Sequence, residues 1–185
     1  MGGCVNLVFR LIRVLLTGLL GTGIDPLDES RVAFRVWPND LDINIHMNNG
    51  RYLTLMDLGR LDLALRAGLF RMFLQQGWRP VLGGAIIRYR RPLGAFKHYH
   101  LTTRILGWDE KWAFMEQRFM VGNEVHAIGY CKGIMLKGGK SLPMPEALAA
   151  IGYILPSPPL PPGIAAWIEA ESSLTVVKTP SNPTA

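Results

Sequence analysis

The sequence is poor in the residues that form disulfide frameworks and metal centres. Cysteine occurs only as Cys4 and Cys131, far apart in the chain, and Cys131 lies in an apolar-rich segment of strand character. The four histidines have neither an HxxxH spacing nor cysteine neighbours at metal-ligand spacing. We therefore expect no disulfide scaffold, no metal and no bound cofactor, and the composition fits the reducing cytoplasm.

Acidic residues are missing between Leu63 and Trp108, and the 185-residue chain has a net charge of +6. The basic residues of this stretch are Arg66, Arg71, Arg79, Arg88, Arg90, Arg91, Lys97 and Arg104. Such a run is typical of a solvated surface, and it also suits a ligand rich in phosphate. Nucleic acid is not expected as a partner, because no binding motif or aromatic stacking pattern accompanies the arginines.

A long uninterrupted apolar segment is also missing. Residues 4–20 (CVNLVFRLIRVLLTGLL) are largely apolar but contain Arg10 and Arg13. A spanning helix needs about 20 apolar residues, and each central arginine would cost about 2.5–3.5 kcal/mol. No signal-peptide cleavage pattern follows. The segment is predicted to be an amphipathic helix that either lies on the inner membrane surface, with its arginines at anionic lipid, or packs on the domain.

Polar side chains are concentrated between Asp40 and Tyr52, in DLDINIHMNNGRY. Asn48 and Asn49 are good N-cap residues for the apolar-periodic segment that follows. Free backbone N–H groups at a helix start hold negative charge, while carboxylates just upstream supply a base or a nucleophile. Acyl transfer needs both features.

The pattern DxDxNxHxNNxxY closely resembles the signature of hotdog-fold acyl thioesterases, both the FadM/YbgC-like (4-hydroxybenzoyl-CoA thioesterase-like) acyl-CoA group and the plant acyl-carrier-protein enzymes. The resemblance covers residues 31–136, and the apolar N-terminal segment is similar to that of the membrane-associated branch of the superfamily. It implies an α+β hotdog fold, with an antiparallel sheet around a long central helix. It also implies a homodimer or dimer of dimers, paired edge to edge.

The order of elements read from the sequence agrees with that fold. We expect a strand at 31–37, a buried helix at 49–69, and a meander of strands at 81–91, 99–108, 112–121 and 125–137. A short helix at 143–152, a proline-dense extended segment and a helix at 165–173 should follow, and the last dozen residues should be frayed. The predicted division is a membrane-proximal helix at 1–24, a thioesterase-like domain at 25–140 and a C-terminal region at 141–185.

The resemblance assigns the site to the signature loop. The acyl-CoA group uses its first aspartate, which is Asp40 here, as general base or nucleophile. The carrier-protein enzymes instead use the residues that match Asp42, Asn44 and His46. We prefer Asp40, and we expect all four side chains to project to one side of an extended loop. Backbone N–H groups near Met47 and Asn48 are expected to hold the oxyanion.

The predicted function is hydrolysis of fatty acyl-CoA, or of an acyl-carrier-protein thioester, to free acid and thiol. The residues expected to bind coenzyme A phosphates are Arg88, Arg90, Arg91, Lys97 and Arg104. Asn44 stands where the acyl-CoA group has glycine, and Asp57 where it has glutamate. Because of these departures, a non-catalytic acyl-CoA or acyl-carrier-binding protein, or a membrane-associated adaptor, stays open as the alternative.

Overall fold

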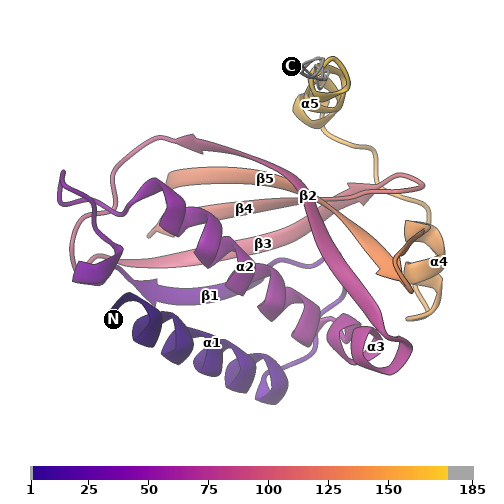
Figure 1. Cartoon of the computed structure of the whole chain (residues 1–185), viewed down its shortest axis with the longest axis horizontal. Helices are drawn as coiled ribbons and strands as arrows, with labels where there is room; N and C mark the ends of the chain where they lie inside the picture. Colours follow the sequence, from indigo (N-terminus) through magenta and orange to yellow (C-terminus); the bar gives the residue numbers. More distant parts are fainter. Residues whose placement is uncertain (1, 175–185) are drawn as a thin grey trace, which may run out of the picture.

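The computed structural model describes residues 2–174, with side chains from residue 6 onward. Its centre is a curled antiparallel sheet with the strand order β1-β3-β4-β5-β2, and β6 pairs with β5 (Figure 1). The strands are β1 (Ser30–Arg35), β2 (Trp78–Tyr89), β3 (His98–Trp108), β4 (Ala113–Val121), β5 (Glu124–Lys137) and β6 (Lys140–Leu142). The predicted meander is confirmed for β3, β4 and β5, but it is wrong for β2, which pairs with β5 at the edge of the sheet and not with β3. Strand β2 also starts earlier than expected, because the buried Trp78 already pairs with Lys137.

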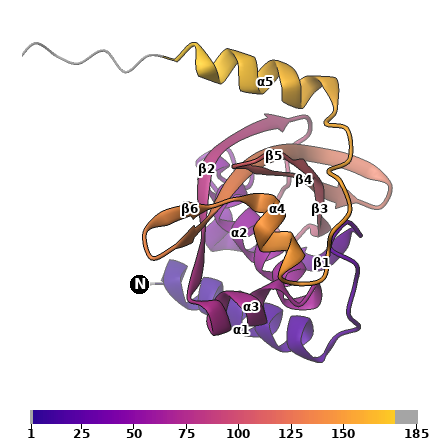
Figure 2. The same ribbon diagram turned by 90° about the vertical axis from the view of Figure 1, so that its right-hand side faces the viewer.

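Helix α2 (Asn49–Arg66) is the central buried helix that the periodicity predicted, and the sheet curls around it (Figure 2). Its Leu55 and Met56 are completely buried. At Gly59, an added Cβ would lie 2.6 Å from Thr103 Oγ1 and 2.8 Å from Gln117 Nε2. Only glycine therefore lets the helix approach β3 and β4 this closely.

The helix ends sooner than predicted, because Gly68 adopts a left-handed conformation with φ of 75°. A second helix, α3 (Leu69–Gln76), follows and stops at Gly77, which is also left-handed with φ of 65°. Phe73 of α3 packs against a second core cluster around Trp78 and Trp108. The core thus has two clusters, one that includes residues of α2 and a second formed by residues of the strands, α3 and α4.

Helix α1 (Gly2–Leu20) packs against α2 and lies beside the edge strand β1 (Figure 1). Val14 is fully buried, and an added Cβ at Gly18 would lie 2.7 Å from Leu65 Cδ1. Of the two arrangements that the sequence left open, the structure has the helix packed on the domain. Among residues 2–174, no helix is long and apolar enough to cross a membrane.

The arginines of α1 point toward the domain. Arg10 donates to the carbonyl of Arg35 at 2.8 Å, and Arg13 donates to the carbonyl of Ala33. They satisfy carbonyl groups on the otherwise unpaired edge of β1, which is one way of protecting an edge strand. The expectation that both arginines lie at anionic lipid is therefore wrong for Arg10, which is only 7% exposed.

The C-terminal region crosses the outer face of the sheet. After α4 (Met144–Ala149), the proline-dense segment runs past β3, where the Trp108 N–H donates to Ser157 Oγ at 2.8 Å. It leads to α5 (Pro162–Ser172), which Lys132 holds through an ion pair with Glu171. The predicted elements of this region are present, and the segment expected to be frayed lies largely beyond the described residues. The three-part domain division stays a prediction.

Candidate active site

The signature loop connects the 3₁₀ turn η1 (Pro38–Asp40) to α2, and it is a tight turn. The Asp42 N–H donates to the carbonyl of His46 at 2.8 Å, and the Ile45 N–H donates to the carbonyl of Asp42 at 3.1 Å. Ile45 has a φ of 59°, which is strained for a β-branched residue. The loop is thus not extended, and the expectation that its polar side chains share one side is wrong.

Asp42 lies at the base of this turn. Its Oδ1 accepts the N–H groups of Asn44 at 2.8 Å and His46 at 3.4 Å, while Oδ2 accepts no hydrogen bond from the described side chains, which start at residue 6, or from the described backbone. Its charge is one of the causes that raise the pKa of Tyr52, in the first turn of α2. Asp42 is therefore a half-buried carboxylate with one oxygen oriented by the backbone, within electrostatic reach of the helix start.

Asp40 has a different environment, with an exposed fraction of 1%. Arg10 donates to both carboxylate oxygens, at 2.9 Å from Nη1 to Oδ1, and the Trp37 N–H donates to Oδ2 at 2.9 Å. Arg51 Nε lies 3.7 Å from Oδ1. A carboxylate whose oxygens both accept hydrogen bonds from a buried guanidinium is poorly suited to take a proton during a reaction at the loop.

The two N–H groups expected to hold the oxyanion are engaged within the protein. The Met47 N–H donates to the carbonyl of Leu93, and the Asn48 N–H donates to the carbonyl of Asp40, both at 2.8 Å. Asn48 caps α2, because its side chain accepts the Gly50 N–H at 2.8 Å. Asn49 is the first residue of α2, and its N–H has no acceptor within the described chain. Of these three N–H groups at the start of α2, only that of Asn49 is left without an acceptor among the described residues.

Two tyrosines lie beside this helix start. The Tyr89 hydroxyl donates to the carbonyl of Asn49 at 3.3 Å, and its ring packs edge-on against Tyr52 at 4.9 Å. Burial is the main cause that raises the pKa of Tyr52 to about 12, so its hydroxyl stays protonated at neutral pH. Apart from strand alternation, no local pattern indicated a role for Tyr89, because its partner lies 40 residues away.

The predicted phosphate-binding residues divide into two places. Arg88 is the next-to-last residue of β2, while Arg90 and Arg91 donate their backbone N–H groups to the carbonyl of His126 at 2.9 and 3.0 Å. The following segment pairs with the signature loop through the bridge between His46 and Gly94. These arginines and Lys97 therefore lie at the loop end of the sheet.

Arg104 is separate from that group. It lies in the middle of β3 and pairs with the buried Glu116 at 2.9 Å. Lys97 precedes β3 by one residue, so the strand rise of about 3.3 Å per residue puts roughly 20 Å between them. The structure does not bring Arg104 together with the other predicted phosphate contacts.

An apolar cavity of about 530 Å³ lies beside the second half of α2. Its walls are mainly aliphatic and aromatic side chains of α2, α3, β2, β5 and α4, and its charged lining residues are Asp57, Arg60 and Arg79. The size falls within the range of about 300–1,000 Å³ that is typical of small-molecule sites. It is suited to an aliphatic chain rather than to a polar group.

The curled antiparallel sheet around one long helix is the hotdog fold, and residues 36–168 match the family model of the thioesterase-like superfamily. The chain belongs to that superfamily. It is 42% identical over 96 residues to Protein THEM6 of Xenopus laevis, which covers 52% of this chain and 46% of that protein. The chain spans about half the length of the curated relatives that it matches.

Solved structures agree with the fold. The probable thioesterase YbaW from Escherichia coli superposes with a TM-score of 0.62 at 22% identity, over 67% of this chain and 96% of YbaW. A thioesterase from Thermus thermophilus, solved with coenzyme A and Zn, has a TM-score of 0.57 at 26% identity, over 65% of this chain and 89% of that one. The hotdog fold and the superfamily predicted from the signature loop are thereby confirmed.

Proposed function

We propose that this protein hydrolyses acyl thioesters, with Asp42 as the general base or nucleophile. The observation that carries the proposal is the half-buried Asp42 carboxylate, held by two loop N–H groups beside the start of α2. Membership of the thioesterase-like superfamily supports the same reaction. We choose Asp42 over Asp40, which the sequence led us to prefer, because the Asp40 carboxylate is buried and bound to Arg10.

The proposed reaction starts when Asp42 takes a proton from water and the resulting hydroxide attacks the thioester carbon. The carbonyl oxygen becomes an oxyanion, which the Asn49 N–H stabilises together with the positive end of the α2 dipole. The carbon–sulfur bond then breaks, and the thiolate takes up a proton. We assign the donation of this proton to His46, which is exposed and lies in the same turn. In the variant with a covalent step, Asp42 attacks directly and water hydrolyses the anhydride.

The proposed substrate is a fatty acyl thioester. The apolar cavity beside α2 suits the acyl chain, and Arg88, Arg90, Arg91 and Lys97 suit the phosphates of coenzyme A or of a carrier arm. The coenzyme A bound to the Thermus thermophilus thioesterase supports coenzyme A, rather than a carrier protein, as the thiol part of the substrate.

The test is release of free thiol from a panel of acyl-CoA and acyl-carrier-protein thioesters, followed with a thiol reagent. The wild-type chain should turn over at least one of them, and Asp42→Asn should lose most of that turnover while still binding the acyl-CoA. If the wild-type protein binds acyl-CoA without releasing thiol, the alternative of a non-catalytic binding protein holds instead. The engaged N–H groups of Met47 and Asn48 are the observation that favours this alternative.

We also propose that the protein lies in the cytoplasm as a peripheral membrane protein. With Arg10 turned inward, the outer face of α1 exposes apolar side chains, among them Phe9 at 67%, Ile12 at 47% and Leu16 at 54%. Such a face binds a membrane by burial of apolar area. Sedimentation with phosphatidylcholine–phosphatidylserine vesicles should carry the wild type down, and Ile12→Asp should leave it in the supernatant. Leu74→Asp is the matched control, because Leu74 is an exposed leucine of α3.

A further inference from the structure

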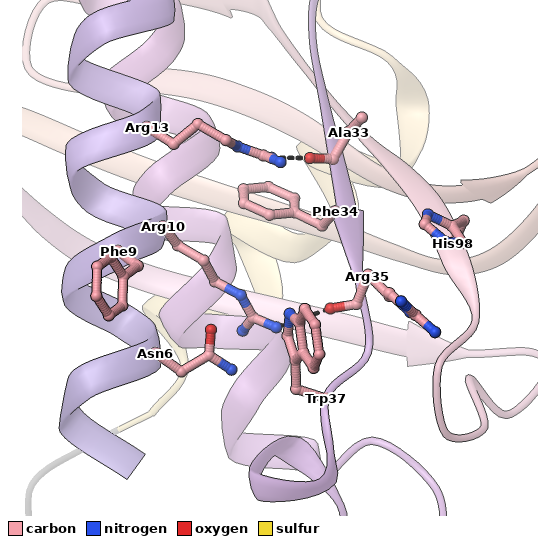
Figure 3. A pocket seen from close by; sticks show the side chains of 9 residues that line it. All are labelled: Asn6, Phe9, Arg10, Arg13, Ala33, Phe34, Arg35, Trp37 and His98. Carbon is pink, nitrogen blue, oxygen red and sulfur yellow. Dashed lines mark hydrogen bonds between the residues drawn. The ribbon is translucent and has the colours of Figure 1, made fainter. Parts of the chain in front are cut away.

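Arg10 joins the N-terminal helix to the signature loop. Its guanidinium makes a two-pronged contact with the Asp40 carboxylate and a third hydrogen bond, of 2.8 Å, to the carbonyl of Arg35. The exposed fractions of the two charged side chains are 7% for Arg10 and 1% for Asp40. Figure 3 shows Arg10 reaching from α1 toward β1, beside Trp37. Arg10 contributes all its polar contacts to this one junction.

Asp40, in turn, ties the start of the loop to its end. Its side chain accepts the Trp37 N–H at 2.9 Å, which fixes the turn before the loop, and its carbonyl accepts the Asn48 N–H at 2.8 Å. Asp42 follows Asp40 by two residues, and Asn49 follows Asn48 directly. The base and the oxyanion donor of the proposed reaction are therefore both anchored through Asp40.

The helix that supplies Arg10 lies outside the part of the chain that matches the superfamily. That match begins at residue 36, after α1 and β1. A buried aspartate needs a cationic partner, because an unpaired charge in the interior is strongly destabilising. In this chain the partner of Asp40 comes from α1, which precedes the matched residues.

We propose that Arg10 is a positioning residue of the thioester site: through Asp40, helix α1 holds Asp42 and the Asn49 N–H in their working geometry. The inference rests on the proposed hydrolysis. Misplacement of reacting groups by about 1 Å costs up to about 100-fold in rate, so the contribution belongs in kcat and not in substrate affinity. Arg13 differs, since it reaches only the carbonyl of Ala33 in strand β1.

The experiment compares Arg10→Ala with Arg13→Ala in the full chain. Arg10→Ala should lower kcat by between about 10- and 100-fold with little change in KM, while Arg13→Ala stays close to wild type. Arg10 lines a groove of about 500 Å³ between α1 and β1, which gives a small cation access to the vacated position. Millimolar guanidinium chloride should restore part of the kcat of Arg10→Ala, whereas equal sodium chloride should not. Asp42→Asn should show no rescue.

A folded Arg10→Ala protein with wild-type kcat overturns the inference, as does an equal loss in Arg13→Ala. If Arg10→Ala does not fold, Arg10→Lys replaces it, because lysine keeps the charge without the two-pronged geometry. A reduced kcat in that variant supports the inference, and a wild-type kcat overturns it.

Amide hydrogen exchange separates this inference from the proposed reaction. Arg10→Ala should speed exchange of the Met47 and Asn48 amides while the Leu55 amide in α2 stays protected. If the wild-type chain releases no thiol, the proposed hydrolysis fails, and exchange alone decides whether Arg10 positions the loop. Unchanged protection at Asn48 would overturn the role of Arg10 even if hydrolysis is observed.

Discussion

Neutralising Asp40 should lower the stability of the protein, whereas neutralising Asp42 should lower its turnover. Asp40→Asn keeps the size of the side chain and an acceptor for the Trp37 N–H, but it leaves the Arg10 guanidinium buried without a counter-charge. Removing one partner of a buried ion pair costs about 3–5 kcal/mol. That is a large share of the roughly 5–15 kcal/mol that stabilises a typical domain. For a chain of this length, the melting temperature should fall by about 6–20 °C, at about 2–4 °C for each kcal/mol.

Asp42→Asn should change the stability of the protein only slightly. The asparagine oxygen still accepts the N–H groups of Asn44 and His46, and the position is half-exposed, so the change should stay within about 0.5 kcal/mol. Without a carboxylate to take the proton from water, kcat should drop by about 10²–10⁴-fold. The loss belongs to chemistry rather than to folding.

Urea unfolding followed by circular dichroism measures the first effect, and thiol release below the lowest melting temperature measures the second. Glu29→Gln, which neutralises an exposed carboxylate before β1, is the control for loss of charge alone. The reasoning fails if Asp40→Asn keeps its melting temperature but loses turnover while Asp42→Asn stays active. In that outcome Asp40 is the base, as the sequence first led us to expect.

Three further predictions test other parts of the molecule. If the cluster at Arg88, Arg90 and Arg91 binds phosphates, KM for acyl-CoA should rise with salt while KM for acyl-pantetheine stays constant; an equal response of both substrates would exclude that role. Burial raises the pKa of Asp62 above 3.8, so ionisation of Asp62 lowers the stability of the folded state as pH rises through the raised pKa. Asp62→Asn should therefore raise the melting temperature at pH 7 but not near pH 3. The exposed edge strand β2, with Ile86 at 42%, should pair with a second copy, so light scattering should give at least a dimer for the wild type. A monomeric mass with detergent masking α1 would contradict this pairing.

Local patterns determined much of this protein. The spacing of apolar residues predicted α2 and the strands themselves, because side-chain period follows directly from backbone geometry. It did not predict that β2 pairs with β5 instead of β3, because strand pairing depends on contacts far apart in the chain. The signature DLDINIHMNNGRY predicted the superfamily and the position of the loop before the helix. It also predicted that Asn48 would cap α2, since capping depends on neighbours within a few residues.

Only the tertiary structure decided which groups in that loop are free. Asp40 and Asp42 have the same chemistry and differ by two positions, and the difference between them is a partner 30 residues earlier, Arg10. The Met47 N–H donates to the carbonyl of Leu93 and is therefore not available to a substrate, and this contact also depends on the folded sheet. Burial and long-range hydrogen bonds set the availability of a carboxylate or an N–H group, and neither is encoded in the spacing of the residues themselves.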